Sequence, residues 1–310
     1  MAIFWGWQGI QPGQSATPPL QGGFEFALIG DLPYTPEQAQ QFQRLITDVN
    51  QTQAAFVIHD GDIKSSIVPC QDTLFLDRRR LFQQFQAPFV LVPGDNDWTD
   101  CHRTGEDPEE RLAKVRSLFF DSDNGLKSFA LNLTHQSEKP QFREYVENVR
   151  WRYGSVLFAG IHVVGSNNNL GRSASGDAEY RRRNEANLDW LKQAFAVAQQ
   201  PDYDALVLII HANPNFGRGL DSGNNGFRDF LQVLETQTTD FSKPVVLVHG
   251  DSHYFQIDKP LVNHKTKQRL MHFTRVETFG DPDVHWVSGR FDPSLPQKFQ
   301  FEPRVVTQNR

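Results

Sequence analysis

The stretch Val57-Ile58-His59-Asp60-Gly61-Asp62 decides the fold, because a short apolar run stops abruptly at carboxylates. The same design recurs at four other places along the chain. They read Ala27-Leu28-Ile29-Gly30-Asp31, Leu91-Val92-Pro93-Gly94-Asp95-Asn96-Asp97, Leu208-Ile209-Ile210-His211 and Leu247-Val248-His249-Gly250-Asp251-Ser252-His253. A single Gly-Asp after a strand is commonly a turn whose aspartate caps the next helix. Five such endings, each at a residue able to bind a metal, call for another explanation.

Short apolar runs alternate with helical patterns along most of the chain. We expect strands at residues 24–30, 54–59 and 89–92, and helices at 35–50, 74–86 and 108–120. After a loop-rich stretch at 121–140, strands at 150–153 and 155–164 form a candidate hairpin around Gly154. A helix at 178–199, a strand at 205–210, a helix at 227–236 and a strand at 245–249 follow, and the tail at 270–301 alternates like antiparallel strands. This order is typical of βαβ units and a largely parallel sheet.

No internal repeat or linker divides residues 24–310, so we predict a single α/β domain of two sheets flanked by helices. Residues 1–23, rich in Gly, Pro and Gln, predict an irregular N-terminal arm. Ligands of open α/β sheets bind beyond the carboxyl ends of the strands, where the five endings should converge. Carboxylates crowded there stay ionised only if cations neutralise them. The cluster would consist of Asp31, Asp62, Asp95 and Asp251.

These endings resemble the motifs of the calcineurin-like metallophosphoesterases, a family that includes the purple acid phosphatases. That family carries, in chain order, D-x-H, G-D, G-N-H-D/E, a lone His after a strand, and G-H-x-H. The counterparts here are Asp31-Leu32-Pro33, Gly61-Asp62, Gly94-Asp95-Asn96-Asp97, His211 and Gly250-Asp251-Ser252-His253. The resemblance runs from about residue 24 to residue 254 and includes the helix around 187–191.

The resemblance implies a four-layer αββα sandwich of two mixed β-sheets flanked by helices, with two divalent metal ions at the sheet edges. The first ion would be held by Asp31, Asp62 and His253. The second would be held by Asp62, Asp95, His211 and Asp251, with Asp62 as the bridge. The implied reaction is hydrolysis of a phosphate mono- or diester, in which metal-bound hydroxide attacks the phosphorus of a small phosphorylated substrate.

The chain departs from the family pattern in three respects, at four positions. Pro33 stands where the first motif has a histidine ligand, and Tyr34 is the candidate replacement. Asp95 and Asp251 replace an asparagine and a histidine, so the proposed shell has four carboxylates and two imidazoles. Such a shell favours Mn²⁺ or Mg²⁺, with Fe, Zn²⁺ or Ca²⁺ as alternatives.

The third departure is Asn96, which replaces the histidine that contacts phosphate and assists the leaving group in the family. Its amide donates a hydrogen bond but no proton at neutral pH. Either another acid serves, with His102, His249 and His59 as candidates, or the substrate has a good leaving group. The predicted catalytic residues are Asp62, Asn96, Asp97, His102 and His249. The predicted substrate-binding residues are Asn96, Lys64, Arg103 and Asn167.

The composition disfavours two other classes of protein. A formal net charge of -6 and a pI near 5.9 argue against a nucleic-acid groove. No stretch approaches the ~20 apolar residues of a membrane span, and the first residues lack the pattern of a signal peptide. We therefore expect a soluble protein without a nucleic-acid partner, whose oligomeric state the sequence leaves open.

Several alternatives stay open. Cys70 and Cys101 are either separate thiols or a disulfide, which would imply a lost leader or an oxidising location, periplasmic or secreted. The chain is either a hydrolase or a catalytically degenerate member of the fold that binds metal or phosphate, as Pro33 and Asn96 suggest. A metal-dependent nuclease is the third reading. The loops at 64–75, 99–107 and 212–226 leave the substrate unidentified.

Overall fold

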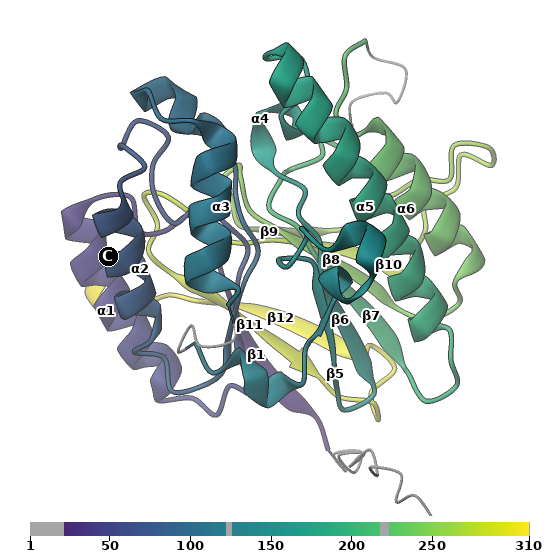
Figure 1. Cartoon of the computed structure of the whole chain (residues 1–310). Helices are drawn as coiled ribbons and strands as arrows, with labels where there is room; N and C mark the ends of the chain where they lie inside the picture. The colour runs from purple at the N-terminus through teal and green to yellow at the C-terminus, as the bar shows by residue number, and fades with distance from the viewer. Residues whose placement is uncertain (1–21, 122–125, 218–222, 310) are drawn as a thin grey trace, which may run out of the picture.

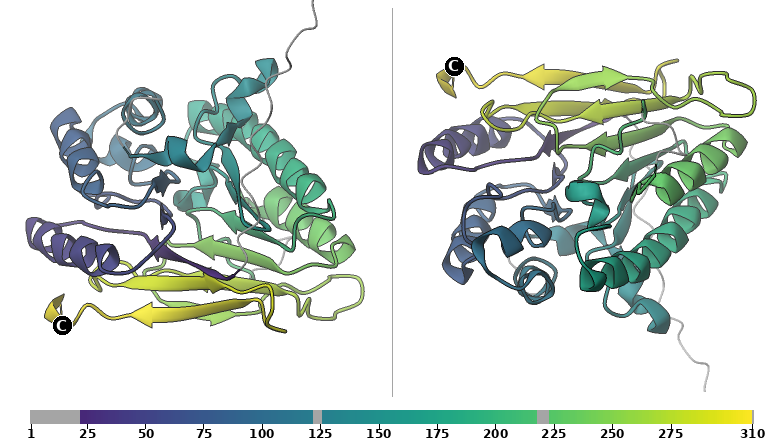
Figure 2. Two further views of the ribbon diagram at one scale, coloured as in Figure 1. Left: turned by 90° about the horizontal axis from the view of Figure 1, so that it is seen from below. Right: turned by 90° about the horizontal axis from the view of Figure 1, so that it is seen from above.

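Two mixed β-sheets pack face to face, and helices cover the outer face of each (Figures 1 and 2). The computed structural model describes residues 22–121, 126–217 and 223–309. The predicted arm at residues 1–23 therefore lies almost wholly outside the described residues. The predicted four-layer αββα sandwich is confirmed. The single-domain interpretation of residues 24–310 stays a prediction.

The first sheet has the strand order β12-β11-β1-β2-β3. Its parallel half consists of β1 (Phe24–Ile29), β2 (Val57–His59) and β3 (Phe89–Leu91). The antiparallel half consists of β11 (Trp286–Phe291) and β12 (Phe299–Arg304). The carboxyl ends of the three parallel strands consequently lie along one edge.

The second sheet has the order β4-β5-β6-β7-β8-β10-β9. A hairpin joins β5 (Val149–Tyr153) to β6 (Val156–Gly160), and β4 (Thr134–His135) pairs with β5. The strands β6, β7 (Ala205–Ile209), β8 (Val245–His249) and β10 (Phe273–Glu277) run parallel. The edge strand β9 (Gln256–Asp258) is antiparallel to β10.

Three of the long helices begin at a residue whose side chain accepts a hydrogen bond from a backbone N–H of the first turn. Thr35 caps α1 (Pro36–Asn50), Asp107 caps α3 (Pro108–Phe119) and Ser173 caps α5 (Ala174–Ala198). The other long helices are α2 (Asp72–Phe82) and α6 (Arg228–Asp240). Two short elements near the strand ends matter for the site, η1 (Thr99–Thr104) and α4 (Gly165–Asn168).

Alternating strand residues divide between two kinds of core, because successive side chains point to opposite faces of a sheet. Phe26, Phe56 and Phe158 meet between the sheets with ring centroids 5.0 to 5.5 Å apart. On the outer faces, α1, α2 and α3 pack on the first sheet, and α5 and α6 pack on the second. This packing fixes the two sheets relative to each other and brings their strand ends together.

The sequence-based expectations were wrong in two places. The tail does not form only antiparallel strands, because β10 pairs in parallel with β8. The predicted strand at 155–164 stops at Gly160. Residues 161–164 lead on toward α4 outside any strand, although Ile161 and Val163 still form backbone hydrogen bonds with Ile209 and His211. Among the described residues, no helix is long and apolar enough to cross a membrane.

Candidate metal centre

The strand ends of the two sheets meet as the sequence predicts. Asp31, Asp62 and Asp95 follow β1, β2 and β3, while His211 follows β7 and Asp251 follows β8. Several hydrogen bonds join the two sheets directly at this edge. The backbone N–H of Asp251 donates to Asp31 Oδ2 at 3.0 Å, and His211 Nδ1 lies 3.0 Å from the Asp60 carbonyl.

Four of the six predicted metal ligands have left-handed backbone conformations. The φ angles are 53° at Asp31, 58° at Asp62, 74° at Asp251 and 61° at His253. Residues other than glycine rarely adopt such angles, and they cluster at functional sites when the surrounding structure holds them there. The backbone is thus bent at these positions to turn the side chains toward one point.

His211 lies at the middle of the cluster. Its Nε2 is 3.0 Å from Asp95 Oδ1, 3.3 Å from Asp62 Oδ1 and 3.9 Å from Asp251 Oδ1. His211 belongs to two groups of possible ligands, and within each group the donor atoms lie within 4.8 Å of one another. The first group is Asp31, Asp62 and His211, and the second is Asp95, His211 and Asp251. Because a carbonyl only accepts hydrogen bonds, Nδ1 of His211 is the protonated nitrogen and donates to the Asp60 carbonyl. Nε2 is then the nitrogen that can bind a metal.

A second imidazole is oriented in the same way. His253 Nδ1 lies 2.9 Å from the Asp281 carbonyl, so Nε2 faces Asp31 at 3.4 Å. The hydroxyl of Tyr34 lies between the same side chains, 3.3 Å from Asp31 Oδ1, 3.2 Å from Asp62 Oδ2 and 3.2 Å from His253 Nε2. The phenol therefore reaches the position at which Pro33 leaves the first motif without a donor.

Glycines permit this crowding. A Cβ on Gly94 would lie 2.0 Å from Asp62 Oδ1, and one on Gly165 would lie 2.5 Å from both Asp95 Oδ1 and Asp251 Oδ1. Any larger residue at either position would push the donor atoms apart. The backbone here is shaped around the carboxylates.

The site is short of positive charge. Burial raises the pKa of Asp62 well above its usual range, and burial together with Asp95 raises that of Asp251 to about 6. Burial by itself lowers the pKa of His211, but the carboxylates of Asp62 and Asp95 outweigh burial and raise it well above the ordinary value. His253 behaves alike, since Asp31 outweighs burial and raises its pKa to about 9. Buried carboxylates that raise imidazole pKa values in this way suit divalent cations.

Asp97, a predicted catalytic residue, lies beneath the cluster and braces two loops. Its Oδ2 accepts hydrogen bonds from the N–H groups of Gly94 at 2.7 Å and Asp62 at 3.1 Å, and its Oδ1 accepts one from Ile63 at 2.8 Å. The side chain is fully buried. The contacts are therefore those of a positioning residue.

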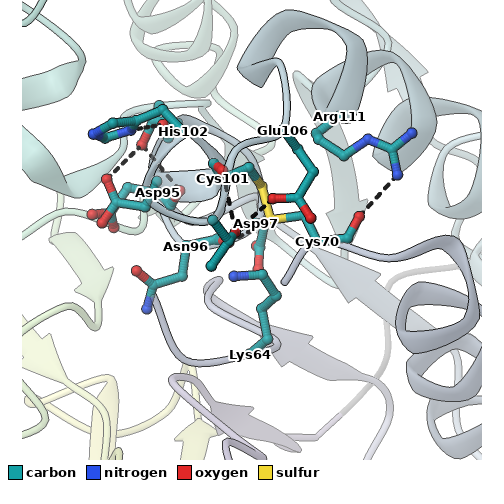
Figure 3. Close-up of a disulfide and its surroundings, with 12 residues drawn as sticks. Lys64, Cys70, Asp95, Asn96, Asp97, Cys101, His102, Glu106 and Arg111 are labelled. Carbon is teal, nitrogen blue, oxygen red and sulfur yellow. Dashed lines mark hydrogen bonds between the residues drawn. A yellow bond between two sulfur atoms is a disulfide. The ribbon is translucent and has the colours of Figure 1, made fainter. Parts of the chain in front are cut away.

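The Cys70–Cys101 disulfide joins the loop after β2 to η1 (Figure 3). Arg111 of α3 donates to the Cys70 carbonyl at 2.8 Å and holds the same loop from outside.

Lys64, predicted to bind substrate, is fully buried and donates to the Ser65 carbonyl at 2.9 Å. Arg103 is about half exposed and pairs with Asp100 at 2.9 Å.

The other predicted residues differ in their contact with the cluster and in their exposure to solvent. Asn96 lies against the cluster, with Nδ2 3.4 Å from the Tyr34 hydroxyl. His102 is exposed on η1, and its Nδ1 lies 2.7 Å from the Thr99 carbonyl. His249 and His59 are fully buried, and burial lowers the pKa of each to about 4. Asn167 is bound to the carbonyl of Leu170 and turned away from the cluster.

The sequence analysis did not single out Ser166 or Asn213 as site residues, yet both contact the cluster. Ser166 donates to Asp95 Oδ2 at 2.7 Å, and the Asn213 N–H donates to Asp251 Oδ2 at 3.0 Å. Asn213 lies two residues after His211, which was a usable signal. Ser166 lies in an irregular turn far from every motif, so only the packing of α4 against η1 brings it there.

Comparisons with known proteins agree with this geometry. The family model described as calcineurin-like phosphoesterase matches residues 24–255. A dimetal phosphatase from Danio rerio superposes with a TM-score of 0.56 at 11% identity, covering 93% of this chain and 97% of that one. PhoD gives 0.56 at 12% (94% and 70%), and a purple acid phosphatase from yellow lupin gives 0.50 at 11% (97% and 53%). At such identities the likeness shows the fold alone. No curated protein matches the chain in sequence.

Proposed function

The chain belongs to the calcineurin-like phosphoesterase family, and from that premise we propose that it hydrolyses phosphate mono- or diesters of small molecules with two divalent cations. One observation carries the proposal: three strand ends of one sheet and two of the other bring four carboxylates and His211 to one point. The formal net charge of -6 argues against a nuclease.

The donor atoms suggest how the cations are shared. Asp31, Asp62, His253 and the Tyr34 hydroxyl would hold the first. Asp62, Asp95, His211 and Asp251 would hold the second, with Asp62 between the two. Oxygen donors dominate, so Mn²⁺ or Mg²⁺ is favoured over Zn²⁺. When bound, the cations would act as Lewis acids and bring the pKa of a coordinated water toward neutrality.

The chain's own side chains would orient the ester and supply a proton. Asn96 faces the cluster through its amide and would donate a hydrogen bond to a phosphoryl oxygen. His102 is the exposed imidazole of the same loop and would give a proton to the leaving group. His249 is a poor candidate for that role, because a buried imidazole with a pKa of about 4 carries no proton to give at neutral pH.

The Cys70–Cys101 disulfide supports an oxidising location, periplasmic or secreted. It also clamps the loop that carries Asn96 and His102, which would keep both side chains near the opening of the centre.

The test measures turnover of para-nitrophenyl phosphate and bis(para-nitrophenyl) phosphate with Mg²⁺, Mn²⁺, Ca²⁺, Zn²⁺ and Fe²⁺ in turn. We expect turnover with Mn²⁺ or Mg²⁺ and a loss of about 100-fold or more in Asp62→Asn. The matched control is Asp77→Asn, since Asp77 is 63% exposed on α2 and pairs with Arg80 away from the metal-ligand set. Metal binding by calorimetry without any turnover would favour the degenerate alternative. Turnover unchanged in Asp62→Asn would refute the proposed centre.

A further inference from the structure

A polar cavity of about 400 Å³ lies on the outer side of the second sheet, beside the metal centre. It is formed by the segment after β7, by β9 and by β10. Its lining residues are Asn213, Asn215, Phe216, Gly217, Asp258, Pro260, Arg269 and Arg275. In Figure 1, β8, β9 and β10 lie together next to α6, which borders this side of the sheet. None of these residues belongs to the metal-ligand set.

The cavity wall is continuous with the centre through Asn213. Its backbone N–H donates to Asp251 Oδ2 at 3.0 Å, and its Nδ2 donates to Ser252 Oγ at 2.7 Å. A molecule whose phosphate lies against Asp251 would therefore extend along Asn213 into the cavity.

Arg275 is held in the cavity as a preorganised cation. Its Nε and Nη2 donate to the two oxygens of Asp258 at 2.7 and 2.6 Å, and its guanidinium lies 5.7 Å from the centre of the Phe216 ring. The side chain is only 10% exposed. Nη1 has no protein acceptor among residues 22–121, 126–217 and 223–309, and it is not sealed from solvent. A fixed guanidinium with a free N–H edge is a binding site for an oxyanion.

The charge of the lining agrees with an anionic ligand. Arg269 is exposed at the rim, where it also donates to the Lys259 carbonyl. Two guanidinium groups face one carboxylate, that of Asp258, so the lining is net positive. The protein as a whole has a net negative charge, so the positive charge of the cavity lining is opposite in sign to that of the protein.

The strand register gives the separation of the two sites. Arg275 lies opposite Leu247 on β8, four residues before Asp251. At about 3.3 Å per residue, the two positions are roughly 13 Å apart along the strand. A ligand that reaches both sites would therefore place its two anionic groups on the order of 10 Å apart.

We propose that this cavity is a second anion subsite, which binds a phosphate or carboxylate on the leaving-group side of the ester. The inference rests on the proposed function and deepens it, because it makes the preferred substrate a molecule with two separated anionic groups. Asp258 and Phe216 are positioning residues that hold Arg275, while Arg269 and Arg275 contact the anion.

The experiment compares alkyl phosphates with 1,n-alkanediol bisphosphates and ω-carboxyalkyl phosphates of rising chain length, using the Mn²⁺-loaded full chain. We expect kcat/KM for one or both series with a second anionic group to exceed that of the matched alkyl phosphate by about tenfold at the spanning length, mainly through KM. Arg269→Gln and Arg275→Lys should remove most of that excess. Arg80→Gln is the control, because Arg80 is 73% exposed and lies on α2, outside the cavity lining. This variant should keep the excess in kcat/KM.

The two proposals fail in different ways. No advantage at any length for either series with a second anionic group, or an equal loss for all three series in the arginine variants, would overturn the subsite. If no ester is turned over, titration calorimetry of the same bisphosphates decides. Binding that Arg269→Gln weakens would retain the subsite and reject the hydrolase, and binding equal in both proteins would reject the subsite.

Discussion

Replacing Asp97 with asparagine should destabilise the protein by about 3 kcal/mol. The buried carboxylate accepts three backbone hydrogen bonds, from Gly94, Asp62 and Ile63. If the amide oxygen takes the place of Oδ2, the Ile63 N–H meets the amide nitrogen and is left buried without an acceptor. Losing a hydrogen bond to a charged group costs about 1.5–3 kcal/mol, and an unsatisfied buried donor costs about 1–3 kcal/mol. The neutral amide avoids the cost of burying a charged carboxylate, which offsets part of this sum, since burial raises the pKa of Asp97.

Urea unfolding measures the free-energy change, and titration calorimetry with Mn²⁺ measures the consequence for the centre. The variant should also bind metal more weakly, because the N–H groups that Asp97 holds belong to the turn that carries Asp62. Asp77→Asn is the control, since Asp77 is an exposed carboxylate that pairs with Arg80. A stability change below about 0.5 kcal/mol would refute the brace. Lost turnover with unchanged stability and metal affinity would instead assign Asp97 a direct role in catalysis.

Three further predictions follow from individual contacts. Tyr34→Phe should weaken one of two metal-binding steps by about tenfold in calorimetry, because the hydroxyl lies within 3.3 Å of three donor side chains; two unchanged steps would exclude Tyr34 from the shell. Cys70→Ser combined with Cys101→Ser should lower the unfolding free energy by roughly 4 kcal/mol, as expected when a crosslink over a separation of 31 residues is lost; a thiol titration that finds two free cysteines in the wild type would remove its basis. Burial lowers the pKa of His162 from 6.5 to about 4, so the unfolded chain takes up its proton first and stability falls by roughly 3 kcal/mol as pH drops from 6.5 to 4. His162→Gln should lose this component, and identical pH slopes in urea unfolding would contradict the assignment.

Local patterns were enough for most helices and strands. The helix over residues 36–50 is marked by the Thr35 cap, by Pro36 in its first turn and by an apolar face, all within one segment of sequence. The strand at Val245–His249 reads as an uninterrupted apolar run that ends at Gly250. Such features depend on neighbours in sequence, which is why they are visible without coordinates.

The pairing of β10 shows where local patterns stop. Alternation at residues 273–277 indicates a strand, but it does not say whether the partner runs parallel or antiparallel. The partner β8 lies about 25 residues earlier, and a returning segment through β9 brings β10 alongside it. The direction of pairing is a property of that path and not of the strand.

The candidate site divides in the same way. The sequence by itself determined that Asp31, Asp62, Asp95, His211 and Asp251 end strands and so meet at one edge, because the carboxyl ends of parallel strands share a side of the sheet. Tertiary structure decided what surrounds them: Tyr34 placed among the donors, Ser166 on Asp95, and His249 buried away from the opening. These contacts depend on which face each side chain takes and on how loops from the two sheets interlock. Burial and cross-sheet distance are set by the packed whole, and no single stretch of sequence encodes them.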